Sequence, residues 1–211
     1  MNRRMPRIST NIRFYQTQCH LHQNTPYSYI EKYLINLSLK IFMKNCIDTI
    51  FERRSIRRYK NEQVPDELLF QVIRAAQYAP SSWNRQPWRF IVIRDREKLK
   101  RISDLLPYGK FLSRVPMAIA IISSEKESDL WLVDGAIATE NLMLAAEELG
   151  LGTCWIAECD REEIKKMLDL PDGFHIITIT PLGYPEIKPK APSRKKIEEV
   201  LFLEKFGEKY L

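Results

Sequence analysis

Apolar residues recur along most of this chain with one of two periods, which are typical of helices and of strands. Helical spacing predicts helices over residues 46–54, 66–79, 96–106, 130–149 and 161–169. Runs of β-branched and aromatic residues predict strands over residues 89–93, 116–123, 153–157 and 174–182. Helices that alternate with strands, without an internal repeat, favour one mixed α/β or α+β domain.

Polar, proline and glycine residues set several of the expected helix boundaries. Pro80 should end the helix before it, because proline disfavours helical geometry in the preceding residue. Asp95 is placed to cap the next helix, and Asp160 with Glu163 has the spacing of a capping box. Gly150 suits the end of the longest helix.

The helix predicted over residues 130–149 is apolar on most sides and rich in glycine and alanine, among them Ala138. A helix that is apolar all round must be buried, either centrally or against a partner chain. Its small residues suit close packing across a dimer.

Composition bounds the class of protein. With 211 residues, of which 45% are hydrophobic and 28% charged, the chain fits one globular domain with a sizeable core. The formal net charge of +6 allows nucleic acid or anionic ligands without selecting between them. No apolar run approaches the roughly 20 residues that cross a bilayer. The four cysteines show no CxxC spacing, which favours reduced thiols and a cytoplasmic location.

Residues 1–42 differ from the rest of the chain. They contain several arginines and no acidic residue before Glu31. Such a start is typical of a transit peptide, but no clear processing signal accompanies it. We predict a poorly ordered N-terminal extension, or an over-extended start, and a functional domain over residues 43–211.

The stretch from Pro80 to Ile93 joins a helix to a strand through a polar loop. Trp83 and Trp88 offer flat apolar surface there. The side-chain amides and hydroxyls of the loop suit a heteroaromatic ring: Ser81, Ser82, Asn84 and Gln86. A polar loop between two rigid elements is a common place for binding groups, although a capped turn with its own hydrogen bonds explains the same residues equally well.

Four arginines and a serine fall within residues 53–59, at the end of a predicted helix. Guanidinium groups and a hydroxyl suit a phosphate, and a second basic cluster at residues 193–196 would complete such a cradle. The same run also fits a solvated helix end or a nucleic-acid contact.

Motifs for other chemistries are absent from the sequence. It contains no GxGxxG, P-loop, HExxH or GxSxG motif, and Cys19, His20 and His22 lack a second ligand pair for a metal. A phosphate cradle and a ring-sized loop, without an acid–base or metal constellation, indicate that a bound cofactor carries the reaction.

Four sequence blocks together resemble the FMN-dependent nitroreductase family: RRSIRRY at 53–59, PSSWNRQPWRF at 80–90, GLGTCWIAE at 150–158 and LGYPEIKPKAPSRK at 182–195. They occur in the family's order and spacing. The resemblance implies an α+β layered fold with a central mixed or antiparallel sheet flanked by helices. It also implies an intertwined homodimer that binds FMN at the subunit interface.

The resemblance further implies which residues bind FMN. The phosphate, the ribityl chain and the pyrimidine side would be held by Arg53, Arg54, Ser55 and Arg57, and the rest of the phosphate site by Arg194 and Lys195. The ring would be lined from the partner chain by Pro80, Ser81, Ser82, Asn84 and Gln86. A backbone N–H toward N5 would come from the segment Trp155, Ile156 and Ala157.

The implied activity is that of a flavin-dependent oxidoreductase without a catalytic side chain. NADH or NADPH would supply electrons that pass through FMN to a nitroaromatic, a quinone or a similar small acceptor by a ping-pong mechanism. Neither nucleic acid nor a membrane is an expected partner. Many nitroreductases carry a long helical insertion where this chain has only residues 124–129, so we expect an open site. The alternatives are a dehalogenating or flavin-modifying branch of the family, and a basic FMN- or nucleic-acid-binding module without turnover.

Overall fold

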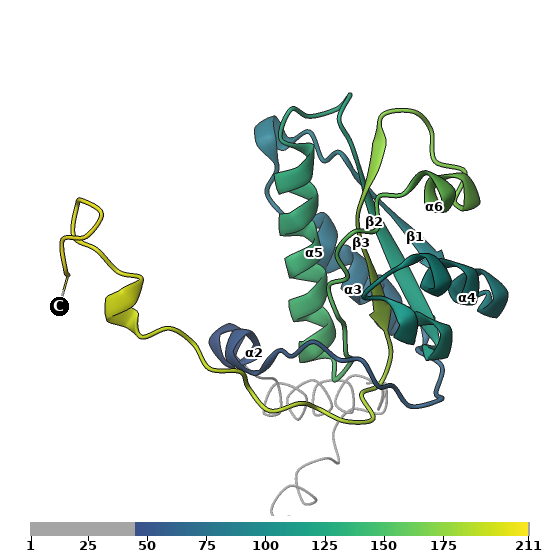
Figure 1. The fold of residues 1–211 in the computed structure, drawn as a ribbon, viewed down its shortest axis with the longest axis horizontal. Helices are drawn as coiled ribbons and strands as arrows, with labels where there is room; N and C mark the ends of the chain where they lie inside the picture. Colours follow the sequence, from purple (N-terminus) through teal and green to yellow (C-terminus); the bar gives the residue numbers. More distant parts are fainter. Residues whose placement is uncertain (1–44, 211) are drawn as a thin grey trace, which may run out of the picture. The chain divides into compact units, whose positions relative to one another are not determined.

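A computed structural model describes residues 45–210, and the predicted extension over residues 1–42 lies outside them. The described elements are, in chain order, α2 (Cys46–Glu52), α3 (Asp66–Gln77), η2 (Ser82–Asn84), β1 (Trp88–Ile93), α4 (Arg96–Leu105), η3 (Lys110–Arg114), β2 (Met117–Ser124), α5 (Trp131–Glu148), α6 (Glu162–Met167), β3 (Phe174–Leu182) and η4 (Ile197–Glu199). Figure 1 labels the main helices and strands.

The strands β1, β2 and β3 form one antiparallel sheet with β2 in the centre. Trp88 of β1 lies opposite Ser123, and Met117 of β2 lies opposite Leu182 on the other side. The strands predicted over residues 89–93, 116–123 and 174–182 are therefore confirmed. So is the fold class, α+β with a central antiparallel sheet flanked by helices.

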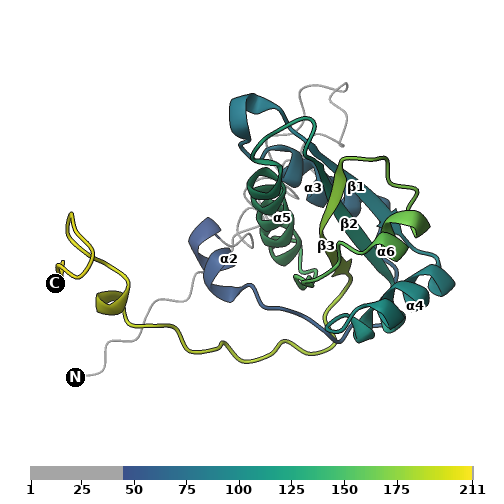
Figure 2. The same cartoon turned by 45° about the horizontal axis from the view of Figure 1, so that its top comes forward.

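Residues of β2 alternate between two hydrophobic layers, as the period of a strand requires. Met117, Ile119 and Ile121 pack with residues of α3 and α5 on one face of the sheet. Ala118 and Ala120 pack with residues of α4, η3 and α6 on the other face. Figures 1 and 2 show the resulting three layers, in which helices cover both faces of the sheet.

The long helix α5 uses its small residues to approach the sheet of its own chain. At Gly135, an added Cβ would lie 2.6 Å from Cγ1 of Ile177. Ala138 and Ala146 are fully buried. The expectation that small residues of this helix pack across a dimer is wrong at these three positions, because residues of their own chain already bury them. Within the described part of the chain, no helix has both the length and the apolar character needed to cross a membrane.

The strand predicted over residues 153–157 is wrong. Thr153 and its neighbours are β-branched or apolar, but the hydrogen bonds of this segment go mainly to side chains. The N–H of Cys154 donates to Oγ1 of Thr180 at 3.2 Å, and the N–H of Ile156 donates to Oγ1 of Thr178 at 3.1 Å. Two threonine hydroxyls of β3 thus hold an irregular segment beside the sheet.

The capping box predicted at Asp160 and Glu163 is also wrong. Helix α6 begins at Glu162, and its N-cap residue, Arg161, makes no side-chain capping bond. The carboxylate of Asp160 instead accepts a hydrogen bond from the N–H of Ile176 at 2.9 Å. It therefore joins β3 to the helix, since it also pairs with the ammonium of Lys165 in α6 at 3.3 Å.

Candidate active site

The arginine-rich segment that follows α2 lies beside the segment that precedes α6. Ser55 forms a parallel β-bridge with Thr153, and the N–H of Ile56 donates to the carbonyl of Thr153 at 2.8 Å. The approach is close, because a Cβ at Gly152 would lie only 2.7 Å from Cγ1 of Ile56. Two sequence blocks that were predicted to share a site are therefore neighbours.

Arg53 presents a donor without an acceptor in this region. Its side chain is 21% exposed, and its Nε lies 3.9 Å from Oε1 of Glu140. Its Nη1 atom is buried and has no hydrogen-bond partner within residues 45–210. A buried, unpaired guanidinium nitrogen is costly, and an anionic oxygen would satisfy it with a charge-assisted hydrogen bond.

The side chains near Arg53 differ in the contacts that they already make within the chain. Arg54 donates from Nη1 to the carbonyls of Phe51 and Arg53, at 2.6 and 2.8 Å, so it closes the end of α2. Burial raises the pKa of the Cys154 thiol, while Arg57 and a hydrogen bond with Ser55 oppose that rise. Ser55 and Arg57 therefore lie close to this thiol, and Arg57 is exposed.

In the segment from Trp155 to Ala157, the middle residue is buried and the two residues beside it are exposed. Ile156 is 1% exposed, and its N–H is taken by Thr178. Trp155 is 39% exposed, and Ala157 is exposed as well. Glu158 follows with a left-handed backbone at φ +60°. Because such geometry is unfavourable for a residue with a side chain, the surrounding fold must impose the turn.

The loop between α3 and β1 is held by its own hydrogen bonds, as the capped-turn interpretation expects. The hydroxyl of Ser81 accepts from the N–H of Gln86 at 3.0 Å. Trp83, Asn84 and Gln86 have left-handed backbones, with φ of +51°, +55° and +49°. Three such residues within four positions are unusual, and backbone strain of this kind gathers at binding sites. Trp83 is 89% exposed, and Asn84 and Pro80 are exposed too.

A buried carboxylate fixes this loop to the body of the domain. Asp134, in the first turn of α5, is 2% exposed. Its Oδ1 accepts from the N–H of Ser82 at 3.0 Å, and its Oδ2 accepts from the hydroxyl of Ser128 at 2.7 Å. Sequence reasoning missed Asp134, although a lone acidic residue near the start of an apolar helix is a signal of a specific partner.

One chain does not bring the loop to the arginine-rich segment. The loop is tied to Asp134, near the start of α5. Arg53 lies near Glu140, and Thr49 of α2 donates to Glu148 at 2.7 Å. From Asp134 the helix rises by about 9 Å to Glu140, beside Arg53, and by about 20 Å to Glu148, beside α2. Figure 1 accordingly shows the loop before β1 and helix α2 at different ends of α5.

Arg194 and Lys195 lie in the exposed segment between β3 and η4. The hydrogen bond that the structure gives Arg194 joins its Nη1 to the carbonyl of Ser193, at 3.5 Å. Within residues 45–210 of one chain, neither of these two residues makes a hydrogen bond or ion pair with the segment around Arg53.

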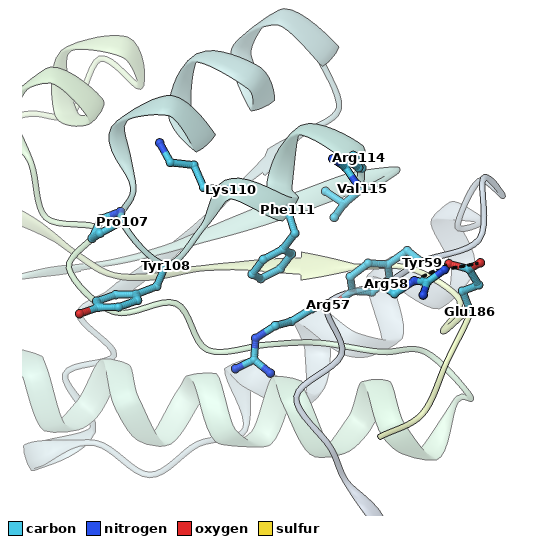
Figure 3. A pocket seen from close by; sticks show the side chains of 10 residues that line it. All are labelled: Arg57, Arg58, Tyr59, Pro107, Tyr108, Lys110, Phe111, Arg114, Val115 and Glu186. Atoms are coloured by element: carbon cyan, nitrogen blue, oxygen red, sulfur yellow. Dashed lines mark hydrogen bonds and ion pairs between the residues drawn. The ribbon is translucent and has the colours of Figure 1, made fainter. Parts of the chain in front are cut away.

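A pocket of about 660 Å³ opens beside Arg57 (Figure 3). Its lining residues are Arg57, Arg58, Tyr59, Pro107, Tyr108, Lys110, Phe111, Arg114, Val115 and Glu186. Sequence reasoning did not select Lys110 or Arg114, because isolated basic residues between a helix and a strand carry no motif. Folding places them on the wall of this pocket that faces Arg57.

Comparison with known proteins decides the family. The model of the Nitroreductase family matches residues 50–107 and 104–184. This chain belongs to the nitroreductase family. The matched ranges contain every predicted site residue except Arg194 and Lys195, so those two rest on the sequence resemblance alone.

Relatives and solved structures of nitroreductases match most of the described domain. An Archaeoglobus fulgidus protein, provisionally named NADH dehydrogenase/NAD(P)H nitroreductase, is 40% identical over 152 residues, which are 68% of this chain and 87% of that protein. The Bacillus subtilis FMN reductase [NAD(P)H] is 30% identical over 166 residues, 68% of this chain and 67% of the relative. An FMN-dependent nitroreductase from Clostridium difficile superposes with a TM-score of 0.71 at 34% identity, covering 76% of this chain and 99% of that structure.

Proposed function

We propose that this nitroreductase-family chain is an FMN-dependent NAD(P)H oxidoreductase that reduces a small nitroaromatic, quinone or similar acceptor. The observation that carries the proposal is the buried Nη1 of Arg53, which lacks an acceptor within residues 45–210, on a segment docked beside residues 152–156. The names of the relatives, an FMN reductase and NAD(P)H nitroreductases, support the cofactor and the electron donor.

The residues present fit FMN. Arg53 and Ser55 would hold its phosphate and ribityl chain, with Arg194 and Lys195 closing over the phosphate. Arg54, which closes the end of α2, would support the segment from behind. When bound, FMN supplies hydride and electron transfer between the two substrates. No protein acid or base is required, since protons can come from water in an open site.

Two backbone N–H groups remain candidates for the one that would face the flavin N5. The N–H of Ile156 is already used by Thr178, so an N–H that faces the flavin N5 would belong to Trp155 or Ala157. Arg57 and Lys110 line one pocket, and their positive charge would lie near the pyrimidine side of the flavin, where a reduced ring gathers negative charge. This electrostatic arrangement would favour electron uptake.

The proposed assembly is a homodimer in which the loop over residues 80–86 of each chain reaches the arginine-rich segment of the other. Support comes from the separation of these parts along α5 in a single chain. Exposed apolar residues of α5 also favour burial against a partner chain: Leu132 and Val133 are 55% and 50% exposed. In the segment after β3, Val200 and Phe206 are 55% and 94% exposed. A cytoplasmic location, where thiols remain reduced, belongs to the same proposal.

A single open pocket beside the ring would serve both substrates in turn. Residues 125–130, between β2 and α5, add no helical cover, and the sequence has no separate dinucleotide-binding motif. The two substrates would then exclude each other, so we expect parallel double-reciprocal plots. Intersecting plots would contradict the shared pocket.

The test begins with purified protein, which should be yellow and should release FMN on denaturation. The double variant Arg53→Ala with Arg194→Ala should lose FMN while its circular dichroism stays unchanged. Arg101→Ala, which removes an exposed charge on α4, is the matched control and should retain FMN. Anaerobic mixing with NADH or NADPH alone should bleach the flavin, and a quinone should restore its colour. Unchanged FMN in the double variant would refute the phosphate assignment, and a flavin that NAD(P)H does not bleach would refute the oxidoreductase.

A further inference from the structure

The pocket beside Arg57 has two facing walls (Figure 3). Arg57, Arg58 and Tyr59, with Glu186, come from the extended segment after α2 and the chain after β3. The other wall is the turn after α4 together with η3, residues 107–115. A volume of about 660 Å³ falls in the range of sites for small organic molecules.

Some of the basic side chains on these walls already pair with acceptors of the same chain. Arg58 forms a two-pronged ion pair with Glu186, with both nitrogen–oxygen distances at 3.2 Å. The ammonium of Lys110 donates to the carbonyl of Asp104 at 2.9 Å. Arg57 and Arg114, by contrast, make no hydrogen bond or ion pair with another residue of the described range 45–210. Two uncommitted guanidinium groups therefore border the pocket, one from each wall.

Aromatic rings line the same pocket. Tyr59 is held in place because its hydroxyl donates to the carbonyl of Ile56 at 2.6 Å. The ring of Phe111 extends from η3 toward the opposite wall in Figure 3, and Tyr108 is 65% exposed at the margin. Ring faces beside free guanidinium groups suit a planar molecule that also carries negative charge.

We propose that this pocket selects an aromatic electron acceptor that carries a carboxylate or a sulfonate, and that Arg114 is the residue that determines this preference. The inference rests on the proposed function, because Arg57 borders both this pocket and the predicted flavin site. Arg114 is placed differently. It belongs to η3, lies outside the predicted cofactor site, and is free to pair with the anionic group of the acceptor.

An anionic group at this place has a second source, the phosphates of the nicotinamide donor. The shared chemistry is an anion near a flat ring, and separate kinetic measurements distinguish the two. If Arg114 pairs with the acceptor, its loss changes kcat/KM for the acceptor. If Arg114 pairs with the phosphates of the donor, its loss changes kcat/KM for NADPH or NADH.

The experiment compares a matched pair of quinones on the FMN-loaded protein: 1,4-naphthoquinone-2-sulfonate and uncharged 1,4-naphthoquinone. The selectivity ratio is kcat/KM for the first divided by kcat/KM for the second. Arg114→Gln should lower this ratio by about tenfold, the effect of one charge-assisted hydrogen bond, and should leave the uncharged quinone unaffected. Arg114→Lys should restore part of the ratio. Arg101→Gln makes the same charge change outside the pocket and should leave the ratio unchanged.

A binding measurement makes the test independent of turnover. Calorimetric titration with naphthalene-2-sulfonate, which cannot accept electrons, should show an affinity that falls by about tenfold in Arg114→Gln and weakens with added salt. An unchanged ratio and an unchanged affinity would overturn the inference. So would a loss confined to NADPH and NADH. Protein without FMN, or without turnover of either quinone, would instead overturn the proposed function, so the two failures are distinguishable.

Discussion

The carboxylate of Asp134 accepts a hydrogen bond from the backbone N–H of Ser82 at 3.0 Å. This contact joins the first turn of α5 to the loop predicted to line the cofactor ring. Asp134 is almost fully buried and is also bonded to the hydroxyl of Ser128. The hydrogen bond therefore anchors the residue that precedes the strained backbone of Trp83 and Asn84. The loop can hold its shape before a ligand binds.

Asp134→Asn should loosen the loop. The asparagine side chain has the same size and keeps one acceptor oxygen. Its NH2 group, however, faces one of the two groups that donate to the carboxylate in the wild type, so two donors meet. We expect a loss of about 1–3 kcal/mol in the free energy of unfolding, as for a buried hydrogen bond to a charged group. Urea unfolding measures this loss, and FMN titration should show weaker binding. Asp129→Asn, an exposed neighbour, is the control. Wild-type stability and FMN affinity in the Asp134 variant would contradict this role.

Gly152→Ala should push the arginine-rich segment away from its neighbour. The added methyl would lie 2.7 to 3.0 Å from three atoms of Ile56, one of which is its Cβ, so the backbone must move. Overpacking of this kind costs about 1–3 kcal/mol. Because Ser55 and Thr153 are paired across the same contact, FMN release on dilution should be faster. A variant with unchanged stability and unchanged FMN release would show that the contact is not needed.

The proposed dimer is best tested on the exposed side of α5. A charge at Ala138 would enter the core of its own chain, because that residue is fully buried. Ile137 is the more informative position, since it is 36% exposed and lies on the same helix. Ile137→Glu should yield a folded monomer, because an unpaired charge in a desolvated interface costs several kcal/mol. Light scattering measures the mass, and Ile137→Leu is the control. A dimer of unchanged affinity in the glutamate variant would place the interface elsewhere.

Sequence pattern alone predicted the parts of the fold that depend on local periodicity. The central strand was found because its residues 117–122 are all apolar and enter one of two hydrophobic layers in turn, a pattern that the chain itself displays. Residues 153–157 were misjudged as a strand. Their bonding partners are two threonine hydroxyls of a later strand, and no local signal announces such a contact.

The candidate site was predictable only where it has a motif. The blocks around Ser55 and Thr153 proved to be neighbours, as their family order implied. Asp134, Lys110 and Arg114 were missed because their roles arise from long-range packing, which a single charged residue in the sequence does not reveal. The relation between the loop over residues 80–86 and Arg53 stays a prediction, since it depends on a second chain.

Acid should weaken the contact that holds the segment before α6. Burial opposes ionisation of Asp160, but hydrogen bonds from Ile176, His175 and Lys165 outweigh it and lower the pKa of this carboxyl below its ordinary value. The folded state thus gains stability above the ordinary pKa of an aspartate, near 4, and loses it as the pH falls through the lower folded pKa. Because the side chain is 37% exposed, the gain should stay below about 1 kcal/mol.

The measurement for Asp160 is urea unfolding of the wild type and of Asp160→Asn between neutral and acidic pH. The variant should be less stable at neutral pH and should lose less stability than the wild type on acidification. Its amide can still accept from the N–H of Ile176, so the comparison isolates the charge. Parallel pH profiles for the two proteins would contradict the assignment.

Two thiols near the site should be inert while the protein is folded. Cys154 and Cys159 are 1% and 2% exposed. Burial raises the pKa of Cys154, although Arg57 opposes it, and raises the pKa of Cys159 to about 11. The reactive form of a cysteine is the thiolate, so both burial and a high pKa suppress alkylation. Iodoacetamide at neutral pH, followed by peptide mass mapping, should leave both residues unmodified in the native protein and modify both in denaturant. Cys46, which is exposed in the single chain, provides the internal comparison. Native labelling of Cys154 at the rate found in denaturant would mean that residues 152–155 separate readily from Ser55, and that the contact on which the proposed cofactor site is built is open in solution.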